Sequence, residues 1–291
     1  MVKLKHLFCT LCKLQSGLLL LAVLVSVPRR AEEPTPSKAF YNTFTDEQEM
    51  AMGRKAAEDI DTQLVLLNEP LLTAYLNHLG QKVARASRRP QIQYSFKIVN
   101  TDVVNTFSLP GGFVYVNRGL LGFVSSESEL VGVLAHQVGH VAAYHCMNDV
   151  ARRTLVDRGM YELQKAGLLN DQAMAAMLPR HGGPMLLFVD RKFSHEEESE
   201  ADMLAIYNAL RAGYDPQGLI SFLARLSEFT GNPTLVQGLL MNHPLPGERA
   251  EALRVELRQH PPPRGLARDS VAFRAAKLQL KALLPPPPPK E

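Results

Sequence analysis

The chain has 291 residues, 46% of them hydrophobic and 21% charged, which is enough for one or two globular domains with a substantial core. Its formal net charge of +3 comes from residues 1–30, which hold five basic residues and no acidic ones; the rest has 27 basic and 29 acidic residues, a net charge of −2. Because the rest of the chain carries no basic excess, the composition argues against a nucleic-acid partner.

Residues 1–30 read as a targeting segment. Basic residues precede an apolar run at 17–27, which is shorter than the roughly 20 residues of a membrane-spanning helix and fits the core of a secretory signal. We therefore expect export to the periplasm or cell envelope. Since no clear cleavage site follows, an uncleaved N-terminal anchor that associates with the membrane is the alternative. The polar, Pro-containing residues 31–44 are expected to form a linker.

Two helices are expected after the linker. Thr45 and Gln48 fit a capping box, which predicts a helix that begins at Thr45. Apolar residues at helical spacing predict a second helix over residues 71–86.

A small sheet of about three strands is expected next. Residues 93–99 alternate between apolar and polar, and the runs at 103–107 and 113–116 follow them. The last two runs are separated by a Leu-Pro-Gly-Gly sequence at 109–112, which indicates a turn.

The remaining pattern is helical. Ser126 and Glu129 predict a capping box at the start of a helix, and residues 147–193 have a helical pattern that is interrupted at 180–184. Ser194 is a good N-cap for a helix that should end at Gly213.

One more helix is expected over residues 247–257, and a Pro-rich tail with one short helix over 261–291. These elements predict an α+β fold, mainly helical with a small β-sheet, whose main domain covers residues 45–260.

The most informative motif is His136-Gln137-Val138-Gly139-His140. Two histidines four residues apart lie one turn above each other on a helix, so both imidazoles can reach one metal ion. In the zinc-peptidase version of this motif, a glutamate after the first histidine acts as the general base toward water. Gln137 cannot accept that proton at neutral pH.

The helix that begins at Ser194 offers a third ligand. A catalytic zinc site needs three protein ligands, and Glu198 could complete the pair of histidines, with Asp202 one turn later to orient a ligating imidazole. Taken one at a time, these residues have plainer explanations. Two histidines can lie on an ordinary helix face, and acidic residues in a first turn often only compensate the helix dipole.

Taken together and in order, four segments resemble the zinc-peptidase family that includes BepA, LoiP, HtpX and the CAAX prenyl protease. The resemblance covers residues from about 41 to 260. The matching segments are residues 105–116, residues 133–141, residues 193–202 with 213–216, and residues 242–244 with Arg249. BepA-like members continue into helical repeats, whereas this chain has one short helix and a proline tail.

The resemblance implies a zincin-like domain with the sheet beside the active-site helix, and it implies a role for each matching residue. One Zn²⁺ per chain would be bound by His136, His140 and Glu198, with Asp202 as the orienting residue and position 137 as the base. His243 would lie near the metal or stabilise the transition state, although a histidine that caps its loop is an equal alternative. The residues expected to bind substrate are Asn105, Phe107, Pro110, Gly111 and Gly112.

His145 is expected to lie outside the ligand set. Five residues separate it from His140, which places it about 140° around a continuous helix. A packed or hydrogen-bonded histidine is the expected role.

Two functions follow for a chain with Gln137. The first is a zinc-dependent metalloendopeptidase of the cell envelope that cleaves misfolded or unassembled proteins and is impaired by the exchanged base. An extended or unfolded polypeptide would add as a strand to the edge near residues 107–116. The second is a non-hydrolytic pseudo-peptidase that binds peptides or acts as a chaperone. A closed structural site with His243 as fourth ligand is a third, weaker reading.

Overall fold

A computed structural model describes residues 39, 41–168, 170, 191–229, 231–283 and 285–286. The expected targeting segment and the expected interruption at 180–184 lie outside these residues. Among the described residues, no helix combines the length and the apolar character that a membrane span requires.

The expected three-stranded sheet is confirmed, with β1 (Ser95–Val99), β2 (Thr106–Leu109) and β3 (Phe113–Asn117). Its strand order is β1-β3-β2, with β3 parallel to β1 and antiparallel to β2. β3 is the central strand, so residues 113–116 have no free edge. The expectation that a peptide could add as a strand near residues 107–116 was therefore wrong for residues 113–116. The edge beside the active-site helix belongs to β2, which contacts α4 (Glu127–Ala142).

β2 begins three residues later than predicted. The Val104 N–H donates to the Leu235 carbonyl at 2.7 Å, so the chain before Asn105 pairs outside the sheet. The turn between β2 and β3 is a short 3-10 helix, η1 (Pro110–Gly112). Gly111 and Gly112 have φ angles of 70° and 88°, a backbone conformation that glycine adopts without strain.

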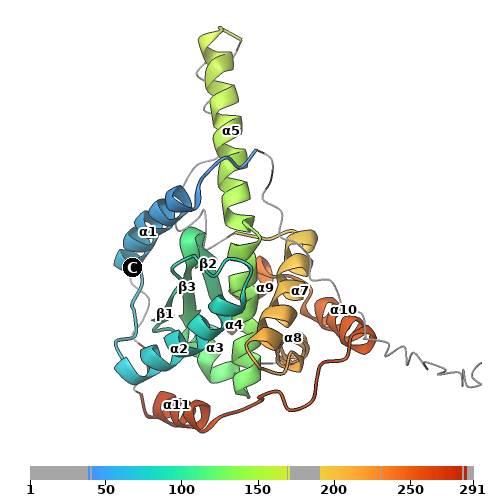
Figure 1. The fold of residues 1–291 in the computed structure, drawn as a ribbon. Coiled ribbons are helices and arrows are strands. Elements are labelled where there is room, and N and C mark those ends of the chain that lie inside the picture. The colour runs from blue at the N-terminus through green and yellow to red at the C-terminus, as the bar shows by residue number, and fades with distance from the viewer. Residues whose placement is uncertain are drawn as a thin grey trace, which may run out of the picture. The chain divides into compact units, whose positions relative to one another are not determined.

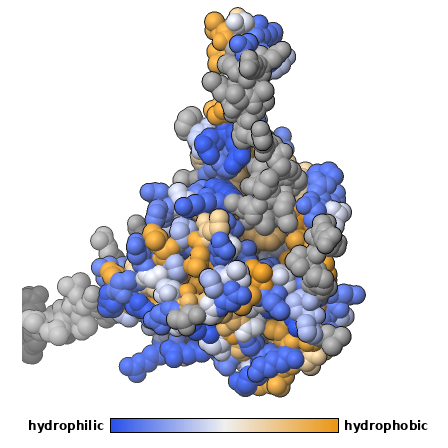
Figure 2. All heavy atoms as spheres, turned by 180° about the vertical axis from the view of Figure 1, so that it is seen from behind, coloured by the Kyte–Doolittle hydropathy of each residue, from blue (hydrophilic) through white to orange (hydrophobic). Residues whose placement is uncertain are grey.

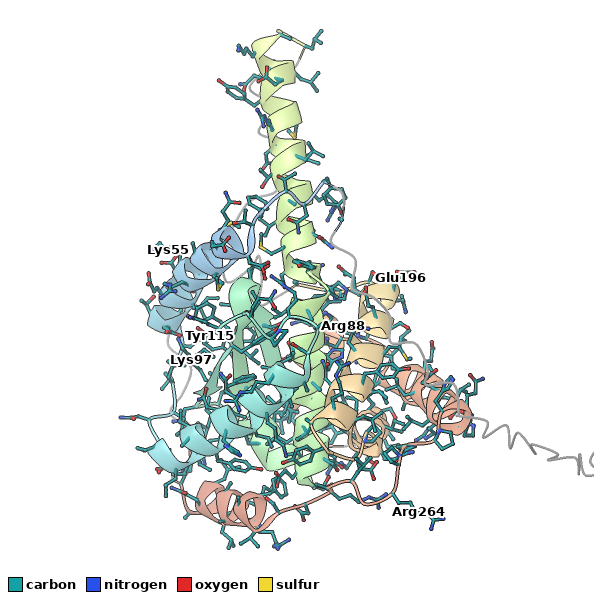
Figure 3. The ribbon with its side chains drawn as sticks, in the orientation of Figure 1. Lys55, Arg88, Lys97, Tyr115, Glu196 and Arg264 are labelled. Carbon is teal, nitrogen blue, oxygen red and sulfur yellow. The ribbon has the colours of Figure 1, made fainter. Side chains whose placement is uncertain are left out.

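The first two helices are confirmed as α1 (Asp46–Gln63) and α2 (Pro70–Ala86), and the capping box of Thr45 and Gln48 has both of its hydrogen bonds. The sheet is attached to α1 through the hydroxyl of Tyr115, which donates to Asp61 Oδ1 at 2.8 Å. Lys97 pairs with the same carboxylate, and Figure 3 shows Lys97 and Tyr115 next to each other beside α1.

α4 is the central helix, and all sixteen of its residues are buried. It contacts α2 and β2, and its strongest packing is against α7 (His195–Arg211) and α8 (Gln217–Ser227), as Figure 1 shows. Two glycines permit this packing. A Cβ at Gly132 would lie 2.7 Å from the Leu219 nitrogen, and one at Gly139 would lie 2.8 Å from the Ala201 carbonyl oxygen.

The N-terminus of α4 differs from the expected capping box. The Ser126 hydroxyl does accept from the Glu129 N–H, but the Glu129 carboxylate accepts from Ser125 instead of returning to the Ser126 backbone. The reason is Arg225 of α8, which forms an ion pair with Glu129 and draws its carboxylate toward α8.

The chain beyond α8 also packs onto this body. η3 (Pro233–Leu235) and α9 (Gln237–Asn242) precede α10 (Pro246–Gln259), which packs against α8 and α7. The expected short tail helix is α11 (Val271–Ala282), and it contacts α2 and α3 (Arg118–Phe123) through buried Phe273 and Leu280. The Lys277 ammonium donates to three carbonyls at the end of α3, from Leu121, Gly122 and Val124, at 2.7–2.9 Å.

α5 (His145–Lys165) is buried only at its start, up to Ala151. Its later turns expose large apolar residues such as Leu155 and Tyr161 next to charged ones, and Figure 2 shows both kinds of surface at this end of the helix.

We predict that Gly139→Ala lowers the free energy of unfolding by about 1–3 kcal/mol, because the added methyl group overpacks the contact of α4 with α7. Urea denaturation measures this. The matched control is Gly159→Ala on α5, where nothing lies within 4 Å of a new Cβ, and there we expect a gain of roughly 0.5–1 kcal/mol. Equal effects at both positions would contradict the close helix contact.

Candidate active site

Four side chains from α4, α7 and the end of α9 converge on one buried point. His136, His140, Glu198 and His243 each offer one ligand atom, and these atoms all lie within 4.8 Å of one another. The first two come from α4, Glu198 comes from the first turn of α7, and His243 follows α9 directly. Among the described residues this is the group of histidines and acids that could hold a metal ion.

The spacing of these atoms fits a tetrahedral zinc ion. Ligands about 2.0–2.1 Å from a tetrahedral zinc lie about 3.3 Å from each other. His136 Nε2 lies 3.0 Å from His140 Nε2 and 3.3 Å from His243 Nδ1. Glu198 Oε1 lies 3.2 Å from His140 Nε2 and 2.7 Å from His243 Nδ1. The nitrogen and carboxylate donors therefore match zinc in both chemistry and spacing.

Asp202 lies against His136. Its Oδ1 is 2.9 Å from His136 Nδ1, although the ring is not turned for a straight hydrogen bond. This contact favours a proton on Nδ1 and leaves Nε2 of His136 free to bind a metal.

Arg249 of α10 holds both acidic residues of α7. Its Nε and Nη2 atoms each donate to Asp202 at 2.7 Å, and its Nη1 pairs with Glu198. Burial by itself would raise the pKa of Asp202, but the Arg249 guanidinium and its hydrogen bonds keep that pKa below the usual value. Burial also opposes the charge on Glu198, and the contacts with His243, His136 and His140 lower the pKa of Glu198.

His140 is fully buried and held from two sides. Its ring stacks on Phe193 with 3.8 Å between ring centroids, and its Nδ1 lies 2.8 Å from His145 Nδ1. Burial, together with the neighbouring His136, lowers the pKa of His140 well below its ordinary value. His140 is therefore neutral at physiological pH, which is the form that binds a metal.

His145 lies outside the group of four ligand atoms, as expected, but the geometric reason given for it was wrong. α4 ends at Ala142, and Tyr144 adopts a left-handed conformation with a φ of 59°. His145 therefore starts α5 instead of continuing α4. This break between the two helices places the His145 ring against His140, whereas a continuous helix would separate the two imidazoles.

Gln137 lies beside His243, on the side of the ring away from the other ligand atoms. Its Nε2 is 3.5 Å from His243 Nε2, the outer limit of a hydrogen bond, and its buried Oε1 has no hydrogen-bond partner. Gln137 also lines a small cavity of about 20 Å³ with Thr106 of β2 and His136. The rest of that cavity is mostly apolar: Val133, Leu219, Phe222, Leu223, Leu226 and Leu239.

The residues expected to bind substrate lie along β2 and its turn, which contact both α1 and α4. Phe107 packs with Ala56, Ala57 and Ile60 of α1. The Pro110-Gly111-Gly112 turn also packs on α1, where the Gly111 N–H donates to Glu49. Asn105 is half-buried at the start of β2, and its side chain accepts from the Thr106 N–H. Of these residues, those of β2 are in contact with α4, the helix that carries His136 and His140.

Comparison with known proteins identifies the family. Residues 70–257 match the model of peptidase family M48, which is more than half of the chain. The chain belongs to peptidase family M48. It is 30% identical over 229 residues to the Beta-barrel assembly-enhancing protease of Yersinia pestis, covering 76% of this chain and 46% of that protein. The protein of the same name from Escherichia coli (strain K12) is also 30% identical, over 228 residues and the same shares of both chains.

A third relative, the Metalloprotease YcaL of Escherichia coli (strain K12), is 27% identical over 160 residues, covering 55% of this chain and 61% of that protein. This chain spans about half the length of the first two relatives. The matched region includes the candidate ligands on α4, α7 and the loop after α9.

Sequence reasoning missed the residues that support the ligands. Arg249 was part of a recognised motif, but no role was assigned to it. The pairing of His145 with Glu200, at 3.2 Å, depends on the turn at Tyr144, which no local pattern indicated. The ring stacking of Phe193 on His140 had no signal in the sequence.

We predict that Arg249→Met lowers the free energy of unfolding of the metal-free protein by about 3–5 kcal/mol at pH 7.5, because two buried carboxylates lose their cation. In the wild type the pKa of Asp202 is depressed, so its contribution to stability is present above the unfolded pKa and is lost as pH falls through the folded one. In the variant, burial favours the protonated carboxyl groups, so the difference between the two proteins should shrink toward pH 5. Urea denaturation at both pH values measures this.

The control is Arg254→Met on α10, whose pair with Glu251 is exposed, and we expect no measurable change there. A deficit for Arg249→Met that is the same at both pH values would contradict the role of buried carboxylate charge.

Proposed function

We propose that this chain is a zinc-dependent metalloendopeptidase of the cell envelope that acts on extended or unfolded polypeptides, and that Gln137 impairs its hydrolytic step. The observation that carries the proposal is the convergence of His136, His140 and Glu198 in a chain of family M48. The donor set fits zinc, and one ion per chain would be held by these three residues, with His243 beside them.

When bound, zinc would supply a Lewis acid that polarises a peptide carbonyl and activates water. The chain's own residues set the conditions for this chemistry. Asp202 and Arg249 hold His136 and Glu198 in place, and burial keeps His140 neutral. Position 137 is the proposed place for a general base, since its side chain lies next to His243 and lines one small cavity with His136.

The edge strand β2 is the proposed docking line for substrate. It contacts the metal-binding helix α4, and its Thr106 borders the cavity beside Gln137. A peptide that pairs with the β2 backbone would pass next to the ligand atoms, and a strand-like peptide is recognised mainly through its main chain.

The proposed location rests on the N-terminal sequence and on relatives. A basic, then apolar segment precedes the domain, and two of the relatives are named for β-barrel assembly. We propose export to the envelope, with misfolded or unassembled proteins as the substrate class.

A second candidate function is a non-hydrolytic peptide binder or chaperone. Gln137 favours it, because an amide keeps the size and hydrogen-bonding capacity of glutamate but cannot take the proton from water. The position of His243 favours it too, since a fourth protein ligand would take the place that water needs in a catalytic site.

We predict that Gln137→Glu raises cleavage of unfolded casein by about 10²–10⁴-fold in the presence of zinc, because it restores a general base. Peptide release measured by fluorescence, with and without a chelator, tests this. The control is the double variant Gln137→Glu, His136→Ala, which should be inactive because a ligand is missing. If Gln137→Glu binds zinc but cleaves nothing, the binder function replaces the peptidase function.

We predict that His243→Ala still binds one zinc per chain, because three protein ligands suffice for a catalytic site. Zinc content after gel filtration, with a chelator competition to obtain the affinity, measures this. The comparison is His140→Ala, which should lose the metal. Loss of zinc from both variants alike would support a closed structural site with four ligands.

A further inference from the structure

Two side chains that are not ligand candidates, His145 and Glu200, lie behind the proposed metal site. Nδ1 of His145 is 2.8 Å from Nδ1 of His140, and Nε2 of His145 is 3.2 Å from Glu200 Oε2. His140 is fully buried, His145 is nearly so, and Glu200 of α7 is partly exposed at the outer end of the series. The three groups form a line from solvent to the ligand atom Nε2 of His140.

The proton positions along this line are linked. A carboxylate only accepts hydrogen bonds, so the His145 nitrogen that faces Glu200 must carry the proton. When His145 carries only this proton, its Nδ1 accepts a hydrogen bond from Nδ1 of His140. This arrangement leaves a lone pair on Nε2 of His140, which points toward His136, Glu198 and His243. In the metal-free protein it competes with Glu198, whose Oε1 lies 3.2 Å from the same Nε2 and favours a proton there.

We propose that Glu200 and His145 are positioning residues that fix the tautomer and ring orientation of His140 for metal binding. This inference rests on the proposed metal site. Asp202, held by Arg249, orients the His136 ring directly. For His140 the carboxylate of Glu200 acts through the His145 imidazole, which lies between them. Partners of this kind typically raise metal affinity by roughly 10–100-fold.

The fold has a specific feature that makes this contact. The left-handed residue Tyr144 separates α4 from α5 and directs His145 back onto His140. Glu200 lies two residues after the proposed ligand Glu198 on the same helix. α7 therefore supplies both a ligand for the metal and the outer end of the relay that Glu200, His145 and His140 form. Packing of α4 on α7 therefore sets the two arrangements at once.

The first experiment compares His145→Asn with His145→Phe. The Asn side-chain oxygen occupies the position of Nδ1 and can accept from His140, whereas Phe keeps a ring but has no acceptor. We expect His145→Phe to weaken zinc affinity about 10–100-fold and His145→Asn to stay within about threefold of wild type, by competition with a chromogenic chelator. The control His260→Phe removes a distant, exposed His–Glu pair and should have no effect. Equal affinities for the Asn and Phe variants would overturn the proposal.

The second experiment reads the tautomers directly in the metal-free protein. With histidines labelled by ¹⁵N, we expect the proton on Nδ1 of His140 and on Nε2 of His145. Glu200→Ala should weaken this preference for His145, and Glu200→Gln, which keeps an acceptor oxygen, should restore it. A proton on Nε2 of His140 in the wild type would overturn the relay.

The two experiments also separate this inference from the proposed function. If the wild type bound no zinc, the metalloendopeptidase proposal would fail, while the tautomer measurement would still decide the relay. If the wild type bound zinc and His145→Phe bound it equally well, only the relay would fail.

Discussion

The candidate site depends on one buried cation. Arg249 pairs with both Glu198 and Asp202, two buried carboxylates on adjacent turns of α7, and offsets one of their two negative charges. Burying a lone carboxylate is unfavourable by several kcal/mol, and the usual escape is protonation, which would remove a metal ligand. The guanidinium makes two hydrogen bonds to Asp202 and keeps that carboxyl group charged in the protein interior. Glu198 pairs with the same guanidinium, and its contacts with His243, His136 and His140 lower its pKa. The remaining features of the site act on carboxylates already held in this form.

The packing of α4 on α7 brings Glu198 next to His136 and His140. Gly139 lies between the two histidines of the motif and permits α4 to approach the Ala201 backbone. A side chain there would push α7 away and carry Glu198 with it. The glycine within the motif is therefore a packing requirement, and it explains why two helices far apart in the sequence can share one metal position.

The sequence predicted those parts of the molecule whose chemistry is local. A capping box located α1, an N-cap serine located α7, alternation located β1, and the four-residue histidine spacing located the two candidate ligands on α4. It failed where a distant group competes with the local one. The Glu129 carboxylate does not complete the capping box, because it pairs with Arg225. β2 begins later than predicted, because the Val104 N–H bonds to the carbonyl of residue 235.

The position of His145 is the clearest case of this limit. On a continuous helix, His145 would point away from His140. The left-handed residue Tyr144 breaks the helix, and the two imidazole nitrogens lie 2.8 Å apart. A non-glycine residue in that conformation has no reliable signature in the sequence.

Glutamine and glutamate at position 137 would give sites of similar shape but different charge and proton chemistry. With a divalent metal bound, the charges of Glu198, Asp202 and Arg249 leave a formal excess of one positive charge when position 137 is glutamine. A glutamate there would bring the same group to zero. The glutamine site would therefore attract an anionic group, such as a peptide carboxylate, more strongly than the glutamate site would. Under the proposed function, hydrolysis and the binding of an anionic ligand would therefore respond in opposite directions to glutamine at position 137, which lacks a base but leaves the site more positive.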